Sequence, residues 1–172
     1  DVEDALEADG LTVTRIAGDD RFITAAEIAA AGTTYGTAPD SENNEVRTAL
    51  LATGRNFPDA IAAGSLAANG ELPLLLTNPG SLPGPTASAL DSLDIEQVFL
   101  LGGTAAVSDD VVNQLEGMGI EVDRIAGEDR FETSAAIADR TSRLLGYSND
   151  NVLLATGRNF PDALALAGLA DV

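Results

Sequence analysis

The chain has 172 residues, of which 9 are basic and 28 acidic, so its formal net charge is −19, and it contains no histidine, cysteine or tryptophan. This length accommodates one full α/β domain, or one and a half smaller ones. The composition excludes histidine general bases, cysteine nucleophiles, disulfides and His/Cys zinc sites. No apolar run reaches the ~18 residues of a membrane span. A protein this acidic is also a poor partner for nucleic acid or an anionic membrane.

Strand-like and helix-like segments alternate along the chain. Continuously apolar strands separated by helices indicate parallel pairing, with helices on both faces of the sheet. We therefore predict an α/β fold with a doubly wound, Rossmann- or flavodoxin-like parallel sheet. In chain order the expected elements are a strand at 12–16, a helix at 20–31, a strand at 48–53, a helix at 58–68, a strand at 72–77, a helix at 85–93, a strand at 97–101, a helix at 108–115, a strand at 122–125, a helix at 130–145, a strand at 151–156 and a helix at 161–170.

Two sequence motifs occur twice. The segment RIAGDDRFIT at 15–24 recurs as RIAGEDRFET at 124–133, with eight of ten positions identical at an offset of 109 residues. The segment LLATGRNFPDA at 50–60 recurs without a change at 153–163, at an offset of 103 residues. Two ordered motifs at nearly the same offset indicate a tandem repeat of about one hundred residues, the size of a domain rather than of a solenoid unit.

The repeat defines the expected domains, which are one complete unit over 11–119 and the first half of a second unit over 120–172. The difference of six residues between the two offsets falls in the polar stretch 33–44, where a surface loop absorbs a length change at small entropic cost. The half unit should leave core surface uncovered, so we expect a continuing chain, or packing against the first unit or another chain.

All nine basic residues are arginine. A GC-rich genome accounts for such a composition, as does adaptation to high salt, where the Debye length falls to about 3 Å at about 1 M. The placement of the arginines is therefore more informative than their number. Arg21, Arg55 and their copies Arg130 and Arg158 each follow a strand and precede or open a helix. Free N–H groups and the helix dipole favour an anion at such positions.

Two interpretations of these arginines stay open. In the first, Asp20–Arg21 and Arg55–Asp59 are intramolecular ion pairs or caps that fix the turns. In the second, the guanidinium groups face an anionic group of a ligand, such as phosphate, pyruvyl or uronate. Pro58 and Asp59 also fit ordinary helix-start chemistry. That chemistry alone does not explain an unchanged copy of eleven residues.

Enzymatic interpretations have little support. The chain carries none of the motifs GxGxxG, GxxxxGK[ST] or GxSxG, and without histidine there is no Ser/His/Asp triad. The paired carboxylates at 19–20 and 109–110 lie where helices are expected to begin, and we interpret them as solvated charges rather than as glycosidase acids. The sequence has no D-x-[DN]-x-[DN]-G calcium loop. We expect no cofactor and no metal site.

Four ordered motifs carry a resemblance to a known family. They are R-I-A-G-x-D-R-F-x-T-[AS]-A-x-I-A, L-L-A-T-G-R-N-F-P-D-A-[IL]-A, P-L-L-L-T and F-L-L-G-G-T-A-A-V-S. Together they resemble the cell wall binding repeat 2 family, over essentially all of 12–170. The resemblance implies non-catalytic, non-covalent anchoring of extracellular surface proteins, such as S-layer components, to the cell wall through an anionic polymer or polysaccharide. It also implies repeats in threes around a pseudo-threefold axis.

The same resemblance implies which residues bind the ligand. A polymer of negative charge would be repelled by the acidic body, so arginine, salt or bridging divalent cations would have to overcome the repulsion locally. Two alternatives stay open: a structural domain of a surface protein with no polymer contact, and an enzyme of sugar or nucleotide chemistry on the same fold. The implied ligand-binding residues are Arg21, Thr24, Asn56 and Asp59 with their copies Arg130, Thr133, Asn159 and Asp162, to which the strand-end residues Arg55 and Arg158 are added.

Overall fold

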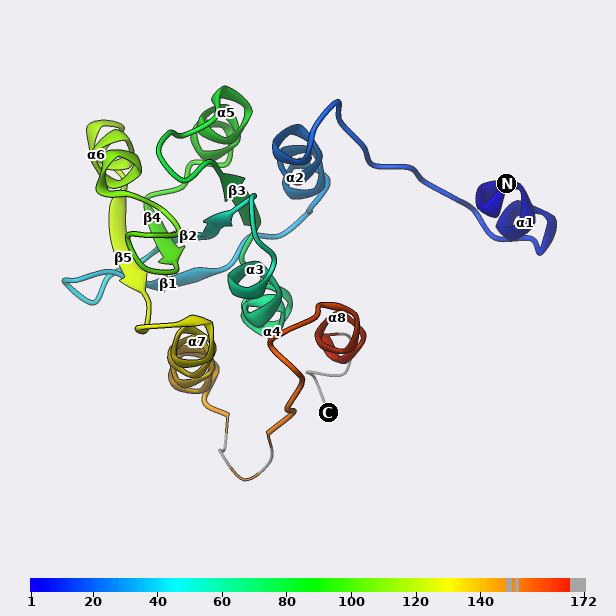
Figure 1. Ribbon diagram of the computed structural model, residues 1–172. Helices are drawn as coiled ribbons and strands as arrows, with labels where there is room; N and C mark the ends of the chain where they lie inside the picture. Colours follow the sequence, from blue (N-terminus) through cyan, green and yellow to red (C-terminus); the bar gives the residue numbers. More distant parts are fainter. Residues whose placement is uncertain (148–149, 151, 168–172) are drawn as a thin grey trace.

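Helices cover both faces of a mostly parallel β-sheet in the computed structural model of the chain, which describes residues 1–147, 150 and 152–167 (Figure 1). β2 (Glu45–Thr53) has β3 (Leu74–Thr77) parallel on one side and β4 (Gln97–Leu101) parallel on the other. β5 (Glu121–Ile125) pairs in parallel with β4, and β1 (Thr37–Pro39) pairs antiparallel with the first residues of β2. The carboxyl ends of the four parallel strands therefore meet at one end of the sheet.

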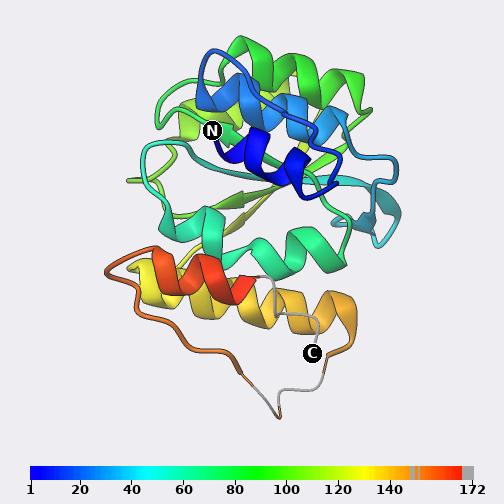
Figure 2. The ribbon, with the colours of Figure 1, turned by 90° about the vertical axis from the view of Figure 1, so that its right-hand side faces the viewer.

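Alternation of side chains along the central strand divides the core into two layers. Ala49 and Leu51 belong to the apolar cluster on one face of the sheet, and Leu50 and Ala52 to the cluster on the other. Figures 1 and 2 show one group of helices on each face. The first cluster is covered by α2 (Arg21–Ala30), α5 (Gly84–Ser92) and α6 (Asp109–Gly117), and the second by α3 (Pro58–Ala62), α4 (Gly64–Asn69) and α7 (Arg130–Leu145).

Two further helices lie outside these layers. α1 (Val2–Ala8) has no buried residue and stands apart from the rest of the molecule in Figure 1. α8 (Pro161–Ala167), drawn in red, contacts α3. Among the helices of the described residues, none combines the length and the apolar character needed to cross a membrane.

The structure confirms the mostly parallel α/β sheet flanked by helices, and most of the predicted elements. The strand predicted at 97–101 and the helix predicted at 130–145 have the bounds of β4 and α7. The helix predicted at 58–68 is divided at Ala63 into α3 and α4. The strands predicted at 48–53, 72–77 and 122–125 are confirmed as β2, β3 and β5, and the helices predicted at 20–31, 85–93, 108–115 and 161–170 as α2, α5, α6 and α8, although 168–170 lie outside the described residues.

The polar stretch 33–44 is not a loop throughout, because β1 forms a hairpin with β2. Oδ1 of Asp40 accepts the backbone N–H groups of Glu42 and Asn44, and the bonds from Asn44 hold the pKa of Asp40 below its usual value. Ser41 donates its backbone N–H and its hydroxyl to the two carboxylate oxygens of Glu121 in β5, at 2.9 and 3.1 Å. The hairpin therefore helps to hold β5 in the sheet.

The segments predicted as strands at 12–16 and 151–156 are not strands where they are described, residue 151 lying outside the described part. Backbone N–H and C=O groups of a strand need a neighbouring strand. β5, the copy of 12–16, has β4 beside it, whereas no strand of the described residues pairs with 12–16. The segment 151–156 is the copy of residues 48–53 in β2. β2 is a strand because β3 and β4 pair with it, and no copy of either is present in the 172 residues to pair with 151–156. Leu154 is accordingly 90% exposed.

Candidate ligand-binding site

The chain leaves β2 and β4 toward opposite faces of the sheet. It passes from β2 to α3 on one face, and from β4 to α6 on the other. Such a reversal is the topological switch point of a doubly wound sheet, where a crevice at the carboxyl ends of the strands receives ligands. The loop after β2 carries Arg55 and Asn56, and the loop after β4 begins with Gly102 and Gly103.

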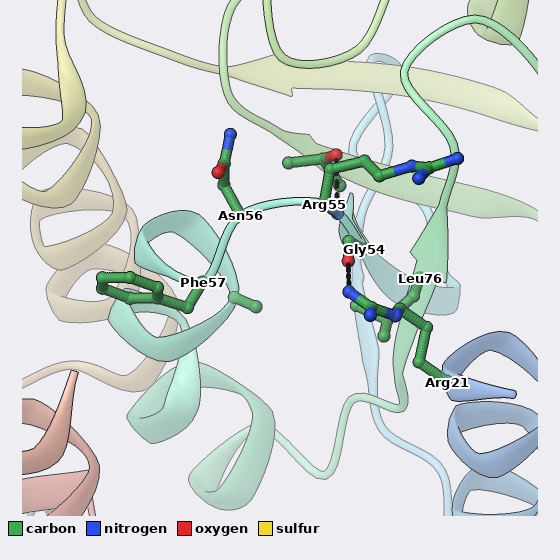
Figure 3. Close-up of a pocket in the computed structure, with 8 residues that line it drawn as sticks. Arg21, Gly54, Arg55, Asn56, Phe57 and Leu76 are labelled. Carbon is green, nitrogen blue, oxygen red and sulfur yellow. Dashed lines mark hydrogen bonds between the residues drawn. The ribbon is translucent and has the colours of Figure 1, made fainter.

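A pocket of about 360 Å³ opens beside this point, at the end of β2 (Figure 3). It brings together three of the residues predicted from the sequence, Arg21, Arg55 and Asn56. Figure 3 shows Arg21 reaching from α2 toward the loop, whereas Arg55 and Asn56 leave the loop in other directions. The remaining lining residues are Thr53, Gly54, Phe57, Ala60 and Leu76. The pocket therefore presents two cations and one amide above an apolar floor.

The first motif fixes Arg21 in this pocket. Asp20 caps α2, because its Oδ1 accepts the backbone N–H groups of Phe22 and Ile23 at 2.8 Å. The hydroxyl of Thr24 accepts the N–H of Gly18 at 3.0 Å and donates to the carbonyl oxygen of Asp20 at 2.9 Å. Both contacts belong to the turn that precedes α2, so Thr24 shapes the approach of the helix rather than lining the pocket.

The two motifs of the first unit dock on each other. Nη1 of Arg21 donates to the carbonyl oxygen of Gly54 (Figure 3). A Cβ atom on Gly54 would lie 2.7 Å from the ring of Phe22, so this position has no room for a side chain. The structural reading of Arg21 is thus correct in part, although its partner is a backbone carbonyl and not a carboxylate.

The second unit repeats this docking. The N–H of Gly127 donates to the hydroxyl of the buried Thr133 at 3.0 Å, and Nη1 of Arg130 donates to the carbonyl of Gly157 at 3.1 Å. A Cβ atom on Gly157 would lie 2.7 Å from the ring of Phe131, as in the first unit. The joint recurrence of the two motifs therefore has a structural reason.

Carboxylate partners separate the arginines into two groups. The four exposed arginines of the strand ends, Arg21, Arg55, Arg130 and Arg158, make no ion pair with a carboxylate within the described residues, although the chain has 28 acidic residues. Neither Asp20–Arg21 nor Arg55–Asp59 is formed there. The other five arginines are paired, as Arg15–Glu3, Arg47–Asp94, Arg124–Asp109, Arg140–Asp123 and Arg143–Asp139.

Asp59 lies in the first turn of α3 at the switch point, and it is only 9% exposed. It approaches Gly102 so closely that a Cβ atom there would lie 2.6 Å from its Oδ2, and Gly102 has a φ of +98° that favours glycine. Burial raises the pKa of Asp59, and the positive charge of Arg130 opposes that rise. Its copy Asp162 is exposed.

The predicted residues in the second copy of the LLATGRNFPDA motif lie at the surface. Arg158, Asn159 and Asp162 are exposed, close to the start of α8. Their neighbour Phe160 contacts its own copy Phe57, with the ring centroids 5.6 Å apart. The two copies of the second motif therefore touch each other through the same side chain.

Sequence analysis missed the role of Arg124. Its Nη1 donates to the carbonyl oxygens of Gly102 and Val107, both at 2.9 Å, and its Nη2 pairs with Asp109 at 3.1 Å. An arginine of the second unit thus clamps the loop after β4 of the first. The available signal was that the predicted strand 122–125 contains two charged residues, Asp123 and Arg124, whereas strands buried on both faces of a parallel sheet are usually apolar.

Fold and site together define a class, an α/β module with a tandem repeat that presents arginines at the ends of its parallel strands. The chain belongs to the family Cell wall binding domain 2 (CWB2), which matches residues 15–112 and 124–172. It is therefore a cell wall binding module, as its sequence motifs predict.

Characterised relatives contain this module within longer chains. N-acetylmuramoyl-L-alanine amidase LytC of Bacillus subtilis (strain 168) is 34% identical over 155 residues, covering 90% of this chain and 28% of LytC. The amidase enhancer of the same strain is 32% identical over 163 residues, covering 94% of this chain and 21% of the relative. This chain thus spans about a quarter of the length of these relatives.

Solved structures support the fold. Cwp6 from Clostridium difficile superposes with a TM-score of 0.65 and 32% identity, covering 75% of this chain and 19% of Cwp6. Cwp8 from the same organism gives a TM-score of 0.63 and 28% identity, covering 81% of this chain and 24% of Cwp8.

Proposed function

We propose that this module binds an anionic cell wall polymer without catalysing a reaction, through the pocket of Arg21, Arg55 and Asn56 and the equivalent residues of the second unit. The observation that carries the proposal is the lack of ion pairs at the strand-end arginines of the described residues. These are Arg21, Arg55, Arg130 and Arg158. In a chain with 28 acidic residues, these four arginines have no carboxylate partner within the described part. Unpaired guanidinium groups above apolar pocket walls suit a ligand that brings its own negative charge.

Arg55 is the residue best placed to contact the polymer. It is exposed, and its side chain makes one long contact within the described residues, from Nη2 to Oδ1 of Asn78 at 3.4 Å. Its guanidinium fork is therefore free to bind a phosphate, pyruvyl or uronate group in two-pronged fashion, and such a charged hydrogen bond contributes about 1.5–3 kcal/mol. Arg21 keeps Nη2 and Nε for the same ligand while Nη1 holds Gly54.

The other predicted residues support these cations in the proposal. Thr24 and Thr133 fix the turns from which Arg21 and Arg130 project. Asp59 is a buried carboxylate at the switch point, and the positive charge of Arg130 opposes the rise in its pKa that burial causes. The net charge of −19 repels an anionic polymer at long range, so salt or bridging divalent cations would strengthen the first approach, and contact would depend on the local arginines.

Cell wall attachment places the protein outside the cell, at the cell surface, where further copies of the repeat would be its partners. The contact between Phe57 and Phe160 supports packing of one repeat against another, as the expected threefold arrangement requires. So does an apolar groove of about 660 Å³ lined by α2 and α4, in which Ile28 is 54% exposed. α7, the copy of α2, packs on α3 and α4 of the first unit, and α2 would receive the same helices of another copy.

A structural domain with no polymer contact is the second candidate. The bonds from Arg21 to Gly54 and from Arg130 to Gly157 favour it, because they give both arginines an internal role. The two candidates differ over Arg55, whose side chain makes one long contact, to Asn78, within the described residues.

Pull-down with purified cell walls tests the proposal. The chain should sediment with intact walls and fail to sediment after the anionic polymers have been extracted. Arg55→Ala should reduce the bound fraction sharply, whereas Arg143→Ala, which removes the same charge from an exposed i,i+4 pair on α7, should not. Equal retention of both variants on intact walls would favour the structural domain.

A further inference from the structure

β5 is a strand of the second unit that completes the sheet of the first. It pairs with β4 in the register Val98 to Val122 and Leu101 to Ile125. The sheet is continued beyond the strand by the N–H of Gly102, which donates to the carbonyl of Ile125 at 2.9 Å. The repeat of the sequence and the unit of the fold are therefore offset here, because the second repeat begins with a strand that belongs to the sheet of the first.

Residues 11–16 of the first unit match β5 position by position. The sequence LTVTRI stands against IEVDRI at 120–125, at the same offset of 109. The apolar positions are kept, with Leu11 equivalent to Ile120, and Ile16 to Ile125. Ile120 and Ile125 are each 5% exposed, whereas Leu11 is 57% and Ile16 41% exposed. The same apolar pattern is therefore buried in the second unit and exposed to solvent in the first.

The arginine of this segment shows the same contrast. Arg124 binds two backbone carbonyls and Asp109, all in the loop and helix that follow β4. Arg15, its copy, pairs with Glu3 of α1 at the surface, where its side chain is 67% exposed. A surface ion pair of this kind contributes about 0–1 kcal/mol. Arg15 thus lacks the carbonyls that its copy binds.

We infer that residues 11–16 are a donor strand, which pairs in parallel with the β4 strand of a preceding repeat and inserts Arg15 into the loop after that strand. In this arrangement Arg15 binds the carbonyls that correspond to Gly102 and Val107. The β4 edge of the chain itself is occupied by β5, so the acceptor is another copy of the repeat. The inference does not depend on polymer binding, because neither the donor strand nor its acceptor edge includes the pocket of Arg55.

A tandem chain tests the inference. Residues 1–119 are joined directly to residues 11–172, so that Leu11 follows Gly119 as Ile120 does in the natural chain. The backbone amides of the internal copy of 12–16 should exchange with deuterium at least about tenfold more slowly than those of the same segment in the 172-residue chain. Exchange at equal rates in both chains would overturn the inference.

The arginine gives a second measurement in the same chains. Arg15→Ala in the internal copy should lower the protection of the donor strand and of the loop after the preceding β4, and Arg124→Ala should have the same effect on β5. The same substitution in the 172-residue chain should leave the sheet amides unchanged, because Arg15 pairs there with Glu3 of α1, which lies outside the sheet. If the internal substitution leaves both segments as protected as before, Arg15 is not a clamp and the inference is wrong.

Discussion

Phe57 and Phe160 meet edge to face, with ring centroids 5.6 Å apart and an interplanar angle of 63°. They are equivalent residues of two copies of one motif, so the contact joins the copies through the same side chain. The motif carries Arg55 and Arg158 two residues earlier, which brings the proposed polymer contacts of both units to neighbouring parts of the surface.

This contact should be measurable as a coupling energy. Edge-to-face aromatic pairs contribute about 0.5–1.5 kcal/mol beyond the area they bury. Phe57→Ala and Phe160→Ala should therefore be non-additive by about this amount in a double-mutant cycle on the free energy of unfolding. Phe160→Ala should also speed proteolysis near α8 while the sheet stays intact. Additive effects would mean that the two rings are neighbours without stabilising one another.

Gly54→Ala should destabilise the fold, because the added methyl group would lie 2.7 Å from the ring of Phe22. Overpacking of this kind costs about 1–3 kcal/mol. Gly117→Ala, at the end of α6, is the matched control, since nothing lies within 4 Å of its Cβ position. The control should be neutral or stabilising by about 0.4–1 kcal/mol in chemical denaturation. Equal losses of stability would show that the two motifs do not dock closely.

Arg124→Ala should cost at least about 2 kcal/mol, because it removes charged hydrogen bonds to two carbonyls that lie beneath it. Arg143→Ala, which breaks an exposed pair, should cost about 0–1 kcal/mol. Thermal unfolding of both variants checks the difference. A small effect of Arg124→Ala would mean that strand pairing, the hairpin contact of Ser41 and the Arg140–Asp123 pair hold β5 without this arginine.

The pH dependence of stability should reveal Asp59. Burial raises its pKa in the folded state, so the folded chain holds the proton more tightly than the unfolded chain does. The stability that Asp59 contributes is complete below its unfolded pKa of about 3.9 and is lost as the pH rises through its folded pKa. Asp59→Asn should therefore gain stability relative to the natural chain as the pH is raised from about 4 to 7. A gain that does not change with pH would contradict the raised pKa.

Sequence reasoning recovered the elements that are determined locally. After Gln97, β4 is a continuous apolar run, and all its residues are buried, so the apolar run and the glycines that follow it sufficed. The strand predictions at 12–16 and 151–156 were wrong, where these residues are described, for a reason that no local pattern contains. Both segments have the side chains of a strand, but a strand also requires a partner, and only the tertiary structure shows whether one is present.

The candidate site, too, could be predicted only in part from the sequence. The strand-end arginines could be located from the sequence, because parallel strands bring their carboxyl ends together. Their partners could not, since the carbonyl of Gly54 lies 33 residues from Arg21 and carries no signal of its own. The sequence also did not show that the other five arginines pair with carboxylates and that the strand-end arginines differ from them in this respect. Only the structure shows this difference.

The most direct test of the polymer site is the dissociation constant of the chain for poly(glycerol phosphate), with polygalacturonate as the uronate probe and dextran as the neutral control. The double variant Arg55→Ala/Arg158→Ala should weaken binding to at least one of the anionic polymers by at least about tenfold per arginine, from the 1.5–3 kcal/mol of each charged contact. The account predicts an unchanged constant for Arg143→Ala and no binding to dextran. Equal affinity of the double variant and of Arg143→Ala for both anionic polymers would contradict it.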